Sequence, residues 1–263
     1  MKHRPPFPFP HLTASPGRHP SRDRKSGFTL VELLVVVAIV AVLAALLIAV
    51  TSRMQHSART AQAASNIRQI GTLLASYTQE NNSCLPILRT TPDHTLGSNP
   101  DNFQFWQNYL RIHAGLGYTG NPQRDCWLPA IFYDPTVKKG RQHLWGCFGG
   151  NDAIFLHDTA CAWAFGHTRG TPLSRIGPPE RKVVVASASD VKGSRFDSSW
   201  YFSGGSWANQ GEASGLPKPA ARHGGKSLAL FADGHVETLD TAHMSREDRR
   251  RYFLPDGYGS GWW

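Results

Sequence analysis

Glu32 is a lone carboxylate near the start of a long apolar segment. The 23 residues from Phe28 to Val50 contain only Thr29 and Glu32 as polar members. A carboxylate at membrane depth is costly unless it meets a cation, and such groups usually have a function. Two interpretations follow. Glu32 is either an interfacial acid that reaches water and is favoured by the helix dipole, or an acid that has a partner or a function within the membrane.

Two histidines and an aspartate lie around a predicted hairpin near the C-terminus. Residues 227–232 and 235–239 have strand patterns, and Asp233-Gly234 between them is typical of a two-residue type I′ turn. If the hairpin brings His223 near Asp233 and His235, they could form a metal site or an acid–base pair. We favour the alternative, in which His223 hydrogen-bonds the hairpin and Asp233 serves the turn conformation.

The cysteines are candidates for disulfides or for a metal site, and there are four: Cys84, Cys126, Cys147 and Cys161. They allow three pairings, and pairing the two that are closest in sequence gives Cys147–Cys161 and Cys84–Cys126. The repeat His-x3-Cys, at His143/Cys147 and His157/Cys161, has the ligand count of a zinc site. The stagger of the repeats and the oxidising compartment inferred below favour disulfides.

Patterns typical of enzymes do not stand out. There is no clear Ser-His-Asp order, phosphate-binding loop or carboxylate pair, and Gly224-Gly225-Lys226-Ser227 lacks the upstream glycine of a phosphate loop and precedes a strand. We therefore expect no enzymatic activity and no cofactor.

The length of the apolar segment predicts a membrane-spanning helix. At about 1.5 Å per residue, residues 28–50 reach roughly 34 Å, enough to cross a hydrocarbon core. Residues 1–27 contain six Lys and Arg and one Asp. The positive-inside rule then places the N-terminus in the cytoplasm and the rest of the chain outside it.

Net charge gives little support for nucleic-acid binding. The formal charge is +9, of which residues 1–27 contribute +5 and residues 28–263 contribute +4. No predicted helix carries a long basic stripe, so we expect no nucleic-acid partner.

The segment Lys25-Ser26-Gly27-Phe28-Thr29-Leu30-Val31-Glu32 resembles the prepilin signal of type IV pilins and type II secretion pseudopilins. The resemblance implies that a prepilin peptidase cuts between Gly27 and Phe28 and methylates the new N-terminus at Phe28. It also implies that Glu32 pairs with the N-terminal amine of a neighbouring subunit during assembly. The fixed spacing of charge, Gly, Phe and Glu before an apolar run makes the signal specific.

The membrane helix should continue as an amphipathic helix. Apolar residues recur at helical spacing: Met54, Ala58, Ala61, Ala64, Ile67, Ile70, Leu74 and Tyr77. We expect one helix of about 50 residues that ends near residues 81–83, before Pro86, and whose outer half is covered by a sheet. Residues 64–71 and 77–82 also resemble the helical signature of pilin-like proteins that carry a His-x9-Asp-Gly domain.

The hairpin segment carries the second half of that resemblance. His223 lies ten residues before Asp233, and Gly234 follows, which fits the His-x9-Asp-Gly signature of prepilin-type processing-associated domains, a group that resembles type II secretion pseudopilins. Major pseudopilins of that system bind calcium in a C-terminal loop. Asp240, Asp248 and Asp256 cannot be aligned with those ligands, so a calcium site stays open and its ligands unknown.

The remaining segments give weaker predictions. Residues 84–180 should be rich in loops, with regular elements only near 103–112 and 160–165. Residues 182–188 form a β-branched run typical of a central strand, and Tyr201-Phe202 should start another strand before a Gly- and Ser-rich loop through residue 214. Residues 245–251 suggest a helical turn, and the C-terminal aromatic residues should pack back on the sheet.

Together these observations predict an α+β, pilin-like fold, in which a long N-terminal membrane-spanning helix packs on a small antiparallel sheet with a loop-rich middle. We expect a removed leader at 1–27, a transmembrane and fibre-core helix at 28–50, its amphipathic continuation at 51–83, and an extracytoplasmic domain at 84–263 with the hairpin at 223–240.

The expected function is that of a type II secretion pseudopilin in the inner membrane, with its C-terminal domain in the periplasm. Its partners would be the prepilin peptidase, other pilin or pseudopilin subunits, an inner-membrane assembly platform and secreted cargo. One alternative is a type IV or competence-type minor pilin in a surface fibre. Another is a membrane-anchored binding or hydrolytic domain.

Overall fold

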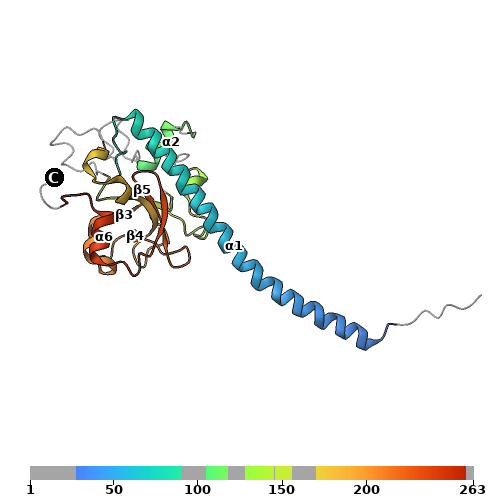
Figure 1. Cartoon of the computed structure of the whole chain (residues 1–263). Coiled ribbons are helices and arrows are strands. Elements are labelled where there is room, and N and C mark those ends of the chain that lie inside the picture. Colours follow the sequence, from blue (N-terminus) through green and yellow to red (C-terminus); the bar gives the residue numbers. More distant parts are fainter. Residues whose placement is uncertain (1–27, 90–104, 118–127, 145, 156–169, 259–263) are drawn as a thin grey trace, which may run out of the picture. The chain divides into compact units, whose positions relative to one another are not determined.

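The computed structural model describes residues 28–89, 105–117, 128–144, 146–155 and 170–258. The chain divides into two compact units between Val50 and Thr51. Figure 1 shows the elements of the second unit, in which helices lie on a central sheet.

Helix α1 spans Leu30–Glu80 and contains 51 residues. It includes a stretch that is long and apolar enough to cross a membrane, by length and composition. At its C-terminal end, Asn82 and Ser83 adopt left-handed conformations with φ of 54° and 56°, and the Ser83 amide donates to the Thr78 carbonyl at 2.8 Å. This 6→1 bond satisfies one of the final carbonyls and ends the helix. The predicted length and end of the helix are confirmed.

The other helices are short. They are α2 (Trp106–His113), α5 (Gly204–Gln210) and α6 (Arg246–Phe253), and the 3₁₀ turns are η1 (Ala130–Phe132), η2 (Leu173–Arg175), η3 (Pro179–Arg181) and η4 (Gly211–Ser214). Helices α2 and α6 lie where regular structure was predicted. The segment predicted as a loop through residue 214 instead contains α5 and η4. Its glycines gave no helical signal, but Trp207 and Ala208 are buried and stabilise α5 by packing.

The sheet contains β1 (Phe148–Asn151), β2 (Val183–Ser189), β3 (Tyr201–Phe202), β4 (Lys218–Pro219), β5 (Ser227–Phe231) and β6 (Val236–Leu239). The strand order is β3-β1-β2-β5-β6, and β4 pairs with β2. Strand β2 is central, as predicted. The sheet is mixed, because β1 and β3 are parallel while the other pairs are antiparallel. The predicted antiparallel sheet is therefore found, except for the parallel pair of β1 and β3.

Alternate residues of β5 build two hydrophobic layers. Leu228 and Leu230 belong to one core with four residues of α1: Ala63, Ile67, Ile70 and Leu74. Ala229 and Phe231 belong to a second core with Trp207 and Phe253 from α5 and α6. Because successive strand residues point to opposite faces, α1 covers one face and α5 and α6 cover the other (Figure 1).

The amphipathic stripe predicted on α1 is buried only in part. Ile67, Ile70 and Leu74 are buried against the sheet, as expected from their spacing. Met54, Ala58 and Ala61 have the same periodicity but are exposed, and Met54 retains 66% of its accessible surface. Periodicity identifies a face of a helix but does not show how far along it the sheet reaches.

The hairpin between β5 and β6 is confirmed, but its turn differs from the predicted type. The Gly234 amide donates to the Phe231 carbonyl at 3.0 Å, and the Phe231 amide donates to the His235 carbonyl at 2.9 Å. Gly234 has a φ of 95°, whereas Asp233 does not have a positive φ. The loop is thus a three-residue type I turn followed by a glycine bulge, which is the next most common hairpin connection.

Gly71 marks the closest approach of α1 to the sheet. A Cβ atom there would lie 2.8 Å from Cδ1 of the buried Leu230. We expect Gly71→Leu to destabilise the second unit by about 1–3 kcal/mol through overpacking. Thr72→Leu, on the exposed side of the same turn, is the control and should change the free energy of unfolding by less than about 0.5 kcal/mol. Urea unfolding of the full chain in detergent measures both, and equal effects would contradict this packing.

Candidate functional site

Glu32 lies in a capping box at the start of α1. The Glu32 amide donates to Thr29 Oγ1 at 3.2 Å, and the Thr29 amide donates back to Glu32 Oε2 at 2.9 Å. The Thr29 hydroxyl adds a third bond to the same carboxylate oxygen at 2.8 Å. This reciprocal arrangement satisfies two amides that would otherwise lack partners at the helix N-terminus.

The capping box leaves one carboxylate oxygen for another partner. Both Thr29 bonds end on Oε2, and Oε1 makes no hydrogen bond within the described chain. Phe28, directly before the cap, retains 72% of its accessible surface. An amine carried by a second chain could therefore reach Glu32 while the cap stays intact.

Thr29 is the functional residue that our sequence reasoning missed. The pattern Thr-x-x-Glu before an apolar run is the signature of a capping box and was present in the sequence. It supports both interpretations of Glu32, since the same carboxylate caps its own helix and stays exposed to a partner.

The first part of α1 carries large apolar side chains that are exposed in the described structure. Its large apolar side chains retain between 49% and 78% of their accessible surface; examples are Leu30, Val35, Leu43 and Ile48. A continuous apolar surface of this kind marks a contact with lipid or with other protein chains.

His223 forms the centre of a buried polar cluster in the second unit. Its Nε2 lies 3.0 Å from Asp134 Oδ2 and 3.1 Å from Ser187 Oγ, and its Nδ1 lies 3.5 Å from Thr60 Oγ1. The side chains of His223 and Asp134 are fully buried. The cluster therefore connects α1, β2, the loop after η1 and the turn before β5.

Asp134 is held in its ionised form. Burial alone would raise the pKa of Asp134, but the hydrogen bond and charge of His223 and the hydrogen bonds from Thr136 outweigh it, so the pKa lies below its ordinary value. Thr136 contributes its hydroxyl at 2.6 Å and its amide at 2.9 Å, both to Oδ1. The cluster is thus a paired and hydrogen-bonded buried charge.

The cluster does not have the geometry of a catalytic triad. In a triad, the acid binds one imidazole nitrogen and the nucleophile the other. Here Asp134 and Ser187 share Nε2, and Ser187 is fully buried. The geometry favours a structural role.

Asp233 and His235 form a separate, exposed pair at the hairpin turn. His235 Nδ1 lies 2.6 Å from Asp233 Oδ1, and the side chains retain 42% and 36% of their accessible surface. His223 precedes β5 and Asp233 follows it, so the strand separates them. The predicted alternative of one site built from His223, Asp233 and His235 does not form, because the hairpin pairs β5 with β6 and leaves His223 at the opposite end.

The cysteines are described in part. Cys84 and Cys147 are buried and are not bonded to each other. Cys126 and Cys161, their partners in the pairing considered above, lie outside the described residues, so that pairing stays a prediction. Burial raises the pKa of the Cys147 thiol to about 11, which makes it a poor nucleophile.

Metal sites are not seen in the part of the chain that the structure describes, where no three His, Cys, Asp or Glu side chains cluster. His157 and Cys161 of the considered zinc site lie outside this part. The three aspartates considered for calcium have other neighbours: Asp240 binds His243, Asp248 binds the N-cap residue Ser245, and Asp256 pairs with Lys182.

The comparison with protein families finds one match. Residues 22–48 match the family described as the prokaryotic N-terminal methylation motif. No curated protein and no solved structure matches the chain significantly. The match and the long apolar helix support the class of pilin-like or pseudopilin-like precursors, which are processed by a prepilin peptidase, anchored in a membrane and assembled with other subunits.

Proposed function

We propose that the chain is a pseudopilin of a type II secretion system. The observation that carries this proposal is the exposed Glu32, five residues after Gly27 in a segment that matches the methylation motif. In this proposal the peptidase cuts after Gly27 and methylates Phe28. The new amine of one subunit then pairs with Glu32 of its neighbour.

The apolar surface of α1 supports the proposal physically. Before assembly, lipid covers the side chains that their own chain leaves exposed, and in the fibre the same side chains pack against neighbouring helices. A carboxylate moved into such a fibre core needs a cation, which the processed N-terminus supplies. The subunit interactions are therefore set by the first turn and the apolar surface of α1.

The topology in this proposal follows the charge of residues 1–27. The N-terminus is cytoplasmic, α1 crosses the inner membrane, and the second unit is periplasmic. An inner-membrane platform and its ATPase extend the fibre, which moves cargo outward. The resemblance of residues 182–240 to the His-x9-Asp-Gly domain belongs to the same proposal.

Fractionation of cells tests this function. With the assembly ATPase present, the chain should move from the membrane fraction into a fibre fraction, and deletion of its gene should leave secretion substrates in the periplasm. An ATPase-dependent surface fibre with normal secretion would instead favour the type IV or competence-type pilin. A chain that stays in the membrane with and without the ATPase would contradict both.

A further inference from the structure

A basic groove lies between α1 and the loop of residues 134–142. It consists of two adjoining hollows of about 520 and 590 Å³ that share Val137 and Lys138. His56, Arg141 and Arg222 also line the first hollow, and Arg59 and Lys139 line the second. Among the described residues that line the two hollows, Asp197 is the single acidic one.

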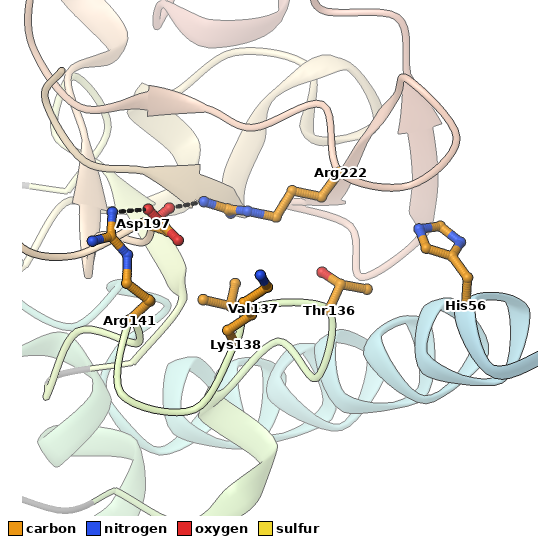
Figure 2. A pocket seen from close by; sticks show the side chains of 7 residues that line it. All are labelled: His56, Thr136, Val137, Lys138, Arg141, Asp197 and Arg222. Atoms are coloured by element: carbon orange, nitrogen blue, oxygen red, sulfur yellow. Dashed lines mark hydrogen bonds and ion pairs between the residues drawn. The ribbon is translucent and has the colours of Figure 1, made fainter. Parts of the chain in front are cut away.

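The one carboxylate of the groove is already neutralised. Arg141 Nη2 lies 2.5 Å from Asp197 Oδ1. The hydrogen bond and charge of Arg141 lower the pKa of Asp197, and the charges of Arg222 and Lys138 add to this effect. Figure 2 shows Asp197 between the two guanidinium groups, with Lys138 on the opposite wall. The groove therefore keeps an excess of positive charge.

The fold holds one of the cations, Arg222, and the loop that carries Lys138 in place. Arg222 donates from Nη1 to the Ala188 carbonyl at 2.8 Å and from Nη2 to the Asp197 carbonyl. Gln142 donates to the carbonyls of Asp134 and Val137, and so fixes the loop that carries Lys138. Preorganised cations bind an anion at a lower cost in side-chain entropy.

The shape of the groove and the chemistry of its walls define the ligand. A small anion would occupy only part of one hollow. Cations line both hollows and Lys138 is shared between them, which suits a linear chain of charges. Guanidinium and ammonium groups approach the first hollow from different segments (Figure 2), and a tetrahedral phosphate can meet donors from several directions. A planar carboxylate is satisfied by one guanidinium, as Asp197 is by Arg141.

Each hollow offers little surface on which rings could stack. Among the described residues, the rings that line them are the His56 imidazole in the first hollow and Tyr133 in the second, and the Tyr133 hydroxyl donates to the Leu144 carbonyl at 2.8 Å. Single-stranded nucleic acids are held largely by base stacking on aromatic side chains. We propose that the basic groove binds a linear phosphate polymer through its charged backbone, without contact to bases or rings.

Binding of long-chain inorganic polyphosphate to the full-length chain in non-ionic detergent tests this proposal. Lys138→Glu should weaken binding about tenfold, because Lys138 lines both hollows. It should also reduce by about one the magnitude of the slope of log binding constant against log salt concentration. Arg59→Glu, on the α1 wall, should act in the same direction. Both side chains are exposed, so we expect these variants to fold.

Arg246→Glu is the matched control. Arg246 is exposed at the start of α6, lines neither hollow and undergoes the same charge change, so binding should stay within about twofold of the original. The basic residues 1–27 are present in every variant, and the difference between variants therefore isolates the groove. Equal losses for Lys138→Glu and Arg246→Glu would overturn the proposal.

Two further probes test the chemistry of the ligand. Polyglutamate of equal charge should bind more weakly than polyphosphate, and equal affinity would overturn the preference for phosphate. An oligonucleotide of equal charge should bind no more tightly than polyphosphate. Tighter binding would overturn the inference that no base is contacted. None of these measurements depends on fibre assembly. The proposal for the basic groove can therefore be overturned without affecting the proposed function, and the reverse is also true.

Discussion

His223→Leu should destabilise the second unit by about 3–5 kcal/mol, which is the usual cost of leaving a buried charge without its partner. The substitution leaves the buried Asp134 carboxylate without the imidazole that lies 3.0 Å away. It also removes the contacts of His223 to Ser187 and Thr60, through which β2 and α1 are joined. Urea unfolding of the full chain in detergent measures the effect.

The exposed pair at the hairpin turn supplies a matched control. His235 Nδ1 lies 2.6 Å from Asp233 Oδ1, which is shorter than the 3.0 Å between His223 and Asp134. The side chains of His235 and Asp233 are, however, partly exposed. Solvent screens such pairs, so His235→Leu should change the free energy of unfolding by less than about 1 kcal/mol. If the two histidine variants were equally destabilised, burial would not be the cause and this account of the cluster would be wrong.

The Asp134–His223 pair also predicts a dependence of stability on pH. The pKa of Asp134 is lowered in the folded chain, so its stabilising contribution is complete above the ordinary aspartate pKa of about 3.9. The contribution is lost as the pH falls below that value and through the lowered folded pKa. Asp134→Asn should flatten the fall in stability below about pH 4, and an unchanged slope would contradict the assignment.

Glu32→Gln should lower the fraction of the chain found in assembled fibres by more than about tenfold. The free-energy cost of losing a buried charge pair exceeds the 1.4 kcal/mol that corresponds to a factor of ten. Glutamine at this position can still accept from the Thr29 amide, so the capping box is retained. The substitution therefore removes the charge and leaves the helix start in place. The measurement is the fraction of chain in sheared fibres.

Thr29→Val is the complementary variant. It removes the hydroxyl that binds both the Glu32 amide and the carboxylate, and it should cost the helix about 1 kcal/mol while the charge is kept. We expect fibre incorporation to fall by less than in Glu32→Gln. Equal losses would assign Glu32 to helix capping and would remove the support for an intersubunit pair.

Features set by local sequence could be predicted well. The length of α1 follows from an uninterrupted apolar run and its amphipathic continuation, and the hairpin follows from two strand patterns around Asp233-Gly234. The β-branched run of residues 182–188 predicted a central strand, and β2 is indeed buried on both faces. In each case neighbouring residues in the chain determine the structure.

Features that depend on distant partners could not be predicted. Asp134 lies 89 residues from His223, and nothing in the loop of residues 134–142 indicates which histidine it meets. Helix α5 forms in a glycine-rich segment because Trp207 packs against Phe253 and the sheet. The basic groove is likewise made from α1, a loop after η1 and the turn before β5, and becomes visible only when these are folded together.

The mass of the mature N-terminus is the most direct test of the central claim, which is that the chain is a processed prepilin. The chain should be expressed with and without an active prepilin peptidase. We predict a chain that begins at N-methylated Phe28 only when the peptidase is present. A chain that keeps residues 1–27 under both conditions would contradict the claim.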